Sequence, residues 1–259
     1  MAGGINLRKK SMFMLCLVII AVFVASIYLY NGLFNKPSTL DKKSTSSTFA
    51  FKNTQIYNIA IIGDSLAKGT GDEKGSGFAT YLPEYLKSSD NENISIYNGG
   101  VNGLKSSELI QQLKSAALDS QISGSDLIVV SIGGNDLLNL INVSDNEKLN
   151  AFKDTQNTFS HNLKDILSTI REKNPNAILA FTGLYNPRED SLSSVVDIAL
   201  NKWNNSAKEI IEQDGKSAFI ETDDLFKSDL KDYISADTLH PNSAGYEAVS
   251  KKIAQLINP

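Results

Sequence analysis

Short apolar runs alternate with amphipathic stretches along the chain from about residue 55. Each run has the length of a strand, and nearly continuous apolar character is typical of strands buried on both faces of a sheet. The predicted strands are Ile59–Ile62, Ile94–Tyr97, Asp126–Ile132, Ala177–Phe181 and Ala218–Ile220.

Helical patterns separate these strands. The longest has six apolar residues at spacings of three, four and seven, on one helical face. They are Leu149, Phe152, Phe159, Leu163, Ile166 and Ile170. Lys208–Glu212 and Ala244–Ile257 are further predicted helices. Strands that alternate with helices predict an α/β domain over residues 55–259, with a parallel sheet covered on both sides.

The amino-terminal segment has a different pattern. Residues 11–35 carry no charge, and Met12–Tyr30 is almost wholly apolar. About twenty helical residues span the roughly 30 Å hydrocarbon core of a bilayer. Arg8, Lys9 and Lys10 precede this stretch, and the positive-inside rule keeps such residues in the cytoplasm. The pattern predicts a cytoplasmic tail at 1–10, a transmembrane anchor at 11–33, a polar tether at 34–54 and an extracellular domain.

A cleaved signal peptide is the alternative for this segment, with Val24-Ala25-Ser26 as the cleavage site and secretion as the result. The apolar stretch is longer than the usual signal core of about 7–15 residues, which favours an uncleaved anchor. Cys16, the single cysteine, cannot form an internal disulfide. It is also a poor lipidation site, because Phe13-Met14-Leu15 before it lacks small residues.

Charge is distributed unevenly. Residues 1–54 hold seven basic side chains and one acidic one of the chain's 25 and 29, which leaves 18 basic and 28 acidic side chains for the remainder. An acidic domain repels a phosphate backbone, so nucleic-acid binding is not expected. With 41% hydrophobic and 21% charged residues, the composition is that of a globular protein with a core and excludes a collagen-like or fully disordered chain.

Candidate chemistry gathers where the strands end, which is where open parallel sheets bind ligands. Ser65, in Gly63-Asp64-Ser65-Leu66, follows the first strand, so its hydroxyl reaches the sheet edge and its N–H can face an anion. The alternative is a turn in which Asp64 or Ser65 only caps a helix.

The chain has two histidines, and they differ in setting. His240 has Asp237 three residues before it on one loop, so a carboxylate can hold one ring nitrogen while the other faces outward. An incidental Asp–His pair remains the alternative. His161 lies opposite the apolar stripe of its helix and is expected at the surface.

Two glycine-rich strand ends complete the set. Asn98–Gly103 follows the second strand, and Gly133-Gly134-Asn135-Asp136 follows the third. A glycine N–H and an asparagine amide are suitable donors to a developing oxyanion. Each segment alone is also ordinary turn chemistry.

Together these four segments resemble the SGNH, or GDSL, hydrolase superfamily of serine esterases, most closely its membrane-tethered or secreted bacterial acylhydrolases. The blocks occur in the family's order over nearly the whole outer domain. The resemblance implies a three-layer, flavodoxin-like α/β/α fold with a five-stranded parallel sheet. It also implies Ser65 as nucleophile, His240 as base and Asp237 as its orienting acid.

The same resemblance implies an oxyanion hole made of the Ser65 N–H, the Gly103 N–H and the Asn135 side chain. Gly100 replaces Gly103 if the loop shifts by three residues. Asp64 supports the turn, and Pro241-Asn242-Ser243 begins the last helix and positions His240.

Other sites are excluded by pattern. The α/β-hydrolase elbow requires Gly-x-Ser-x-Gly, and position 67 is alanine. Gly69–Gly77 lacks the Gly-Lys-Ser/Thr of a phosphate loop and carries two acids, so it is interpreted as a mobile loop at the rim of the site. One His–Asp loop is too small a ligand set for a metal, and no cofactor is expected.

The predicted function is an extracytoplasmic carboxylic-ester hydrolase for an acyl ester, either a lipid or an acylated glycan. Alternatives are an O-deacetylase of cell-surface glycans with the same machinery, a non-catalytic binding module with this fold, and a flavodoxin-like nucleotide- or flavin-binding protein.

Overall fold

The computed structural model describes residues 51, 55–87, 93–138, 140, 147–187 and 193–257. The predicted cytoplasmic tail, the predicted anchor at 11–33 and all of the predicted tether except Phe51 lie outside these ranges. Within the described part of the chain, no helix combines the length and the apolar character needed to span a bilayer.

Five parallel strands form one sheet in the order β2-β1-β3-β4-β5, which confirms the predicted sheet. The strands are β1 (Asn58–Gly63), β2 (Ser95–Gly100), β3 (Leu127–Ser131), β4 (Ile178–Thr182) and β5 (Ser217–Ile220). This order is the flavodoxin-like one, in which the chain changes direction across the sheet between β1 and β3. At this switch point Gly63 pairs with Gly100 on one side and with Ser131 on the other.

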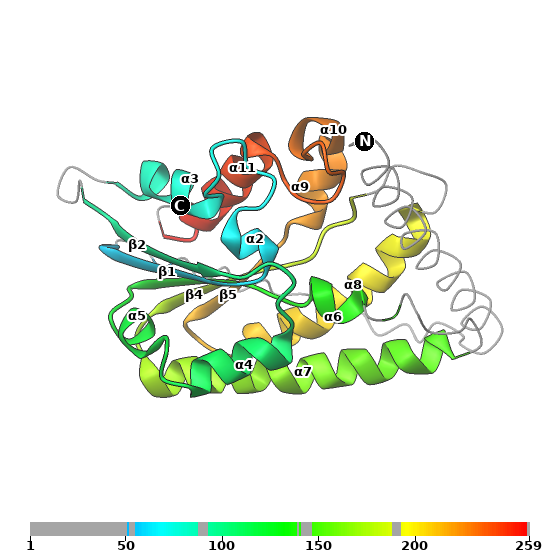
Figure 1. The fold of residues 1–259 in the computed structure, drawn as a ribbon, viewed down its shortest axis with the longest axis horizontal. Coiled ribbons are helices and arrows are strands. Elements are labelled where there is room, and N and C mark those ends of the chain that lie inside the picture. Colours follow the sequence, from blue (N-terminus) through cyan, green and yellow to red (C-terminus); the bar gives the residue numbers. More distant parts are fainter. Residues whose placement is uncertain are drawn as a thin grey trace, which may run out of the picture.

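Helices cover both faces of the sheet (Figure 1). One layer contains α3 (Phe78–Leu86), α9 (Asp223–Ser228), α10 (Leu230–Tyr233) and α11 (Ser243–Ala254). The other contains α4 (Ser106–Lys114), α5 (Asp119–Ser123), α7 (Lys148–Lys173) and α8 (Ser193–Ile211). Two short helices, α2 (Ser65–Lys68) and α6 (Gly134–Leu138), begin just after β1 and β3.

Each face of the sheet has its own apolar core, because successive strand residues point to opposite faces. Ile59 and Ile61 pack into the core under α3 and α11, whereas Ala60 and Ile62 pack into the core under α4 and α7. The predicted stripe of α7 contributes to the second core, in which Phe159 stacks on Trp203 of α8 at 4.3 Å between ring centroids.

Helix α8 is longer than predicted. Lys208–Glu212 covers only its last turn, since the polar run Asn204-Asn205-Ser206 interrupts the sequence upstream. The buried face nevertheless follows spacings of four and three residues: Val196, Leu200, Trp203, Ala207 and Ile210.

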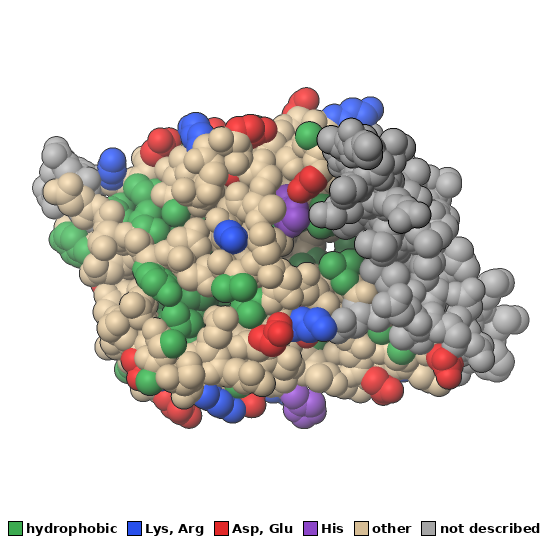
Figure 2. Space-filling model, viewed as in Figure 1, with side chains coloured by type: hydrophobic (Ala, Val, Ile, Leu, Met, Phe, Trp, Pro, Cys, Tyr) green, Lys and Arg blue, Asp and Glu red, His purple; other side chains and the backbone are tan. Residues whose placement is uncertain are grey.

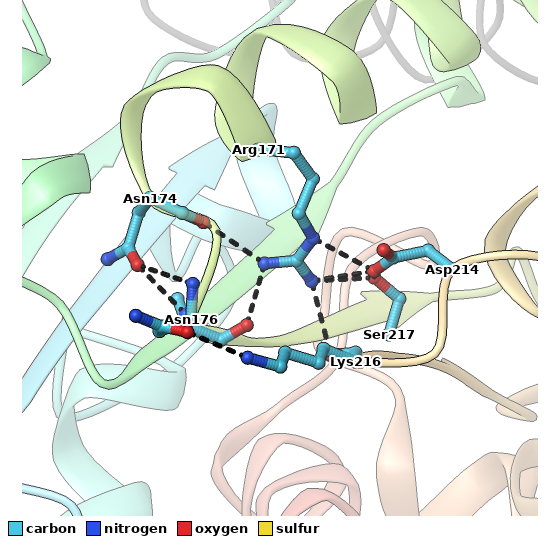
Figure 3. Close-up of polar contacts among 7 residues, drawn as sticks. Arg171, Asn174, Asn176, Asp214, Lys216 and Ser217 are labelled. Carbon is cyan, nitrogen blue, oxygen red and sulfur yellow. Dashed lines mark hydrogen bonds and ion pairs between the residues drawn. The ribbon is translucent and has the colours of Figure 1, made fainter.

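A polar cluster joins elements at the amino-terminal edge of the sheet. Arg171 of α7 bonds Asp214 just before β5 through Nε and Nη2, at 2.9 and 2.7 Å, and Nη2 also reaches Ser217 Oγ at 3.1 Å (Figure 3). Its Nη1 donates to the carbonyl of Ala177 at 2.7 Å, next to β4 (Figure 3). On the face drawn in Figure 2, charged side chains gather mainly over the helical layers above and below the sheet.

Candidate active site

The turn after β1 places Ser65 at the carboxyl edge of the sheet. Gly63 has φ +128°, and a Cβ there would lie 1.8 Å from the carbonyl oxygen of Ser131, so only glycine fits this sharp exit from the strand. Asp64 then caps α2 by accepting the N–H of Leu66 at 3.0 Å. Ser65 is the first residue of α2, so its own N–H has no acceptor within that helix.

Asp64 lies beneath the serine and supports the turn. Its relative exposure is only 3%. Burial raises its pKa to about 7, although hydrogen bonds from the Leu66 N–H and the Ser131 hydroxyl oppose the rise. It makes no hydrogen bond to His240 among the bonds that the structure gives; the histidine uses a different carboxylate.

Ser65, His240 and Asp237 form a hydrogen-bonded chain. His240 Nε2 lies 2.8 Å from Ser65 Oγ, and His240 Nδ1 lies 2.6 Å from Asp237 Oδ2. The serine and the histidine are 175 residues apart in sequence, and the fold brings them together. The carboxylate fixes the proton on Nδ1, so Nε2 is left to accept the proton of the serine hydroxyl.

The loop that carries His240 is held from within. Asp237 Oδ1 accepts the N–H groups of Leu239 and His240, both at 2.9 Å, and the hydroxyl of Ser235 at 2.8 Å. Partial burial raises the pKa of Asp237, but the hydrogen bonds from His240, Leu239 and Ser235 outweigh this, and the net pKa is lowered. The carboxylate therefore stays ionised beside the imidazole.

Tyr185 also holds this loop, and the sequence analysis missed it. Its hydroxyl donates to the carbonyl of Leu239 at 2.5 Å, while its ring stacks on Phe226 at 3.9 Å between centroids. Burial raises the pKa of Tyr185 well above its usual value, so the hydroxyl remains a donor. The residue lies just after β4, and its place at the carboxyl edge of the sheet was the one available signal.

The candidate oxyanion donors lie on the next strand ends. Asn135, the second residue of α6, donates one Nδ2 hydrogen to the carbonyl of Leu104 at 3.0 Å. The N–H of Gly100 is engaged by Asn98 Oδ1 at 3.0 Å. The N–H of Gly103, in an exposed turn with φ +80°, has no hydrogen-bond partner among the described residues.

The loop Gly69–Gly77 lies at the rim, as expected, but it is bonded more firmly than the expected mobile loop. Asp72, 8% exposed, accepts the N–H of Gly77 at 2.8 Å, the hydroxyl of Tyr81 at 3.1 Å and that of Ser243 at 2.7 Å. A Cβ on Gly71 would lie 2.8 Å from the Cβ of His240, so this loop packs directly against the loop that carries His240. The sequence pattern did not show that Asp72 is buried, and the mobility of the loop stays a prediction.

A cavity of about 160 Å³ opens beside the serine. Ser65, His240 and Asn135 lie on its lining. Its walls are otherwise mainly apolar side chains from α6, α7, α8 and the neighbouring loops: Leu137, Leu138, Leu140, Phe152, Leu184, Val196, Ala199 and Leu200.

The GDSL-like Lipase/Acylhydrolase family model matches residues 61–248, which spans the whole site. This chain belongs to that family. The resemblance stated from the sequence is thereby confirmed, and the chain is an enzyme of the lipase and esterase class.

Relatives of this GDSL enzyme include lipases. It is 30% identical over 212 residues to the uncharacterized protein YpmR of Bacillus subtilis, covering 80% of this chain and 83% of YpmR. It is 30% identical to the spore germination lipase LipC of Bacillus licheniformis, over 74% of this chain and 92% of LipC. Among solved structures, the lipase Lip_vut3 from a goat rumen metagenome is 28% identical, with a TM-score of 0.70 over 77% of this chain and 97% of that one.

Remaining predictions on this GDSL enzyme concern its periphery. His161 is exposed, as expected. Asn242 caps α11 by accepting the N–H of Gly245 at 3.0 Å, which places the start of the last helix where it was predicted. Within the described ranges, no group of three or more His, Cys, Asp or Glu side chains could hold a metal ion.

Proposed function

We propose that this GDSL enzyme is an extracytoplasmic serine ester hydrolase that transfers an apolar acyl group to Ser65 and then to water. The single observation that carries the proposal is the Ser65–His240–Asp237 chain at the mouth of an apolar cavity. A partly exposed carboxylate orients the histidine, the histidine faces the serine, and the serine faces space for a substrate.

In the first half-reaction, Ser65 Oγ attacks the ester carbonyl while His240 Nε2 takes the hydroxyl proton. A C–O bond to the serine forms, and the tetrahedral intermediate carries a negative oxygen. Collapse breaks the bond to the alcohol oxygen, which leaves with the proton from His240. Asp237 stabilises the imidazolium between these two transfers.

In the second half-reaction, water attacks the acyl-enzyme. His240 removes a proton from the water and returns it to Ser65 Oγ when the acid product leaves. The reaction needs no electron transfer and no cofactor.

We assign the oxyanion hole to the N–H groups of Ser65 and Gly103 and to the Asn135 amide. Gly103 is preferred over Gly100, whose N–H is already bonded to Asn98. Asn135 uses one amide hydrogen on Leu104, which orients the amide and leaves the second hydrogen for the substrate.

The cavity favours an acyl chain over acetyl. Its walls between α6 and α8 are leucine, valine, alanine and phenylalanine side chains, which match the CH₂ groups of a fatty acyl chain. An O-deacetylase needs only a small acyl site beside a sugar groove. The resemblance to the lipase LipC supports the longer acyl group.

A series of p-nitrophenyl acetate, butyrate and octanoate tests the acyl preference, with Ser65→Ala as the blank. We expect kcat/KM to increase with acyl length to octanoate. Activity on acetate alone would instead assign the enzyme to deacetylation, and a folded wild type inactive on all three would assign the fold to a binding module.

The proposed location rests on the sequence of residues 1–54. The uncharged stretch at 11–33 behind Arg8, Lys9 and Lys10 supports a single-pass anchor with the hydrolase domain outside the cell. Mass spectrometry of the mature amino terminus tests retention, since a protein that begins near Ser26 would be secreted instead.

A further inference from the structure

Asp136 is a buried carboxylate that the mechanism above does not use. It follows Asn135 in α6 and is 8% exposed. Its two oxygens contact one residue: Oδ1 accepts the hydroxyl of Ser106 at 2.5 Å, and Oδ2 accepts the N–H of Ser106 at 3.1 Å. Burial raises its pKa, and the two bonds from Ser106 oppose the rise. Burying a carboxylate is costly, so its retention calls for a role.

The direction of the Ser106 hydroxyl is fixed by a second bond. Asn162 of α7 donates Nδ2 to Ser106 Oγ at 2.8 Å. The oxygen therefore accepts from Asn162 and donates to Asp136, and Ser106 itself is fully buried. The three side chains connect α6, the first residue of α4 and the middle of α7.

The loop 101–105 between β2 and α4 carries Gly103 and ends at this connection. At its start, the N–H of Val101 donates to the carbonyl of Gly63 at 2.9 Å. At its end, the Leu104 carbonyl accepts from Asn135, and the next residue but one is Ser106. Two parallel links thus join this loop to α6: Leu104 to Asn135, and Ser106 to Asp136.

We propose that Asp136 is a positioning residue that sets the oxyanion hole through Ser106. The proposal rests on the assignment of Gly103 and Asn135 to that hole. The two donors come from different segments, and neither segment can fix the separation between them. The Asp136–Ser106 link acts with the Leu104–Asn135 link to fix it, because it holds the carboxyl side of the Gly103 loop to the helix that carries Asn135.

The variant that tests this is Asp136→Asn. Asparagine has the shape of aspartate but only one acceptor oxygen. Ser106 offers two donors, its N–H and its hydroxyl, so one of the two hydrogen bonds to residue 136 is lost. We expect kcat to fall about tenfold with KM changed by less than about twofold, because the effect is on the transition state. Since α6 also lines the cavity, the loss must be the same on acetate and octanoate esters. Ser106→Ala should give the same result.

A double-mutant cycle separates positioning from general damage. In the Asn135→Ala background, Asp136→Asn should cost less than about twofold in kcat, because one of the donors it positions is already gone. Full additivity of the two losses, or unchanged kcat in Asp136→Asn, would overturn the proposal. Asp214→Asn, in the Arg171 cluster at the far edge of the sheet, is the matched control for loss of a bonded carboxylate and should leave kcat unchanged.

A spectroscopic readout keeps this test independent of the proposed function. The amide resonances of Gly103 and of the Asn135 side chain should shift in Asp136→Asn and stay in place in Asp214→Asn. Unshifted resonances would overturn the positioning role. A wild type that hydrolyses no ester would refute the proposed function, while these resonances would still decide whether Asp136 holds the loop.

Discussion

Two polar clusters lie at opposite edges of the same sheet. They contain similar residues but differ in whether a ligand can still bind to them. At the amino-terminal edge, Arg171 gives hydrogens from all three guanidinium nitrogens to protein acceptors (Figure 3). At the carboxyl edge, Ser65 and Asn135 face a cavity and keep capacity for another partner. In the first cluster the guanidinium hydrogens bond to protein acceptors and hold α7 against β4 and β5. In the second cluster, hydrogen-bonding groups remain available to a substrate.

The difference shows which polar networks carry function. Both join segments far apart in sequence, and both contain a carboxylate whose pKa is lowered, Asp214 and Asp237. For each carboxylate, partial burial raises the pKa and hydrogen bonds more than offset it. Only Asp237 contacts a histidine whose other ring nitrogen faces a serine at a cavity. Changes at the amino-terminal edge should therefore affect stability, and changes at the carboxyl edge should affect activity.

Arg171→Met should have the largest effect on stability, a loss of about 3–5 kcal/mol in the free energy of unfolding. The side chains of Arg171 and Asp214 are only 17% and 22% exposed, so the remaining carboxylate is left without its cation. Urea unfolding measures the loss, and kcat of the folded fraction should not change. Lys114→Met removes a pair with Asp165 in which both side chains are about 60% exposed. It should stay within about 0.5 kcal/mol of wild type, and an equal loss there would contradict the distinction.

Asn135→Ala should reduce activity and leave stability nearly unchanged. Loss of one oxyanion donor is expected to reduce kcat by about 10²–10³-fold, with little change in the free energy of unfolding. Steady-state kinetics on p-nitrophenyl octanoate and urea unfolding of the same sample measure both. An unchanged kcat would remove Asn135 from the oxyanion hole.

Tyr185→Phe should have a smaller effect on activity. The variant keeps the ring against Phe226 and loses the hydroxyl bond to Leu239, so the histidine loop is less firmly held. We expect kcat to fall about tenfold or less. Thr222→Val is the matched control, since it removes a buried hydroxyl bond to the Gly183 carbonyl that does not touch the loop. Equal losses in the two variants would assign Tyr185 to packing alone.

Asp64→Asn should change the pH dependence of stability. Burial raises the pKa of Asp64 to about 7 in the folded protein, against 3.8 for an ordinary aspartate. The folded state therefore holds this proton more tightly than the unfolded state. The stability from Asp64 is complete below about pH 4 and is lost as the pH rises through 7.

The decrease in the free energy of unfolding between pH 4 and 7 should thus be smaller in Asp64→Asn than in wild type. Urea unfolding at several pH values measures it, with the exposed Asp154→Asn as control. The lowered pKa of Asp237 acts with the opposite sign, because its stabilisation is lost as the pH falls below about 4, outside this window. Parallel curves for wild type and Asp64→Asn would contradict the assignment.

The sequence predicted the strands well because their apolar runs are uninterrupted and both faces are buried. It also predicted Ser65, His240 and Asp237 as site residues, since each lies at a strand end or beside a recognisable partner, and the fold brings the three into one hydrogen-bonded chain. Most of α8 was missed because polar residues break its apolar stripe. Tyr185 and Asp136 were missed as supports because their partners, Leu239 and Ser106, are 54 and 30 residues away and only the fold shows them.

The proposed preference for Gly103 over Gly100 also rests on the structure. Both glycines suit a strand end, and the pattern does not show which N–H is already bonded. The bond from the Gly100 N–H to Asn98 depends on how the backbone turns at the end of β2. Backbone geometry of this kind is set by packing against α2, which a local pattern does not contain.

The central claim is that His240 and Asp237 activate Ser65 as a nucleophile, and covalent labelling tests it most directly. The full chain is treated with a fluorophosphonate, beside Ser65→Ala and His240→Asn, and the labelled peptide is mapped by mass spectrometry. We predict labelling of wild type at Ser65, none in Ser65→Ala and strongly slowed labelling in His240→Asn. A folded wild type that stays unlabelled, or a label on another serine that persists in Ser65→Ala, would contradict the claim.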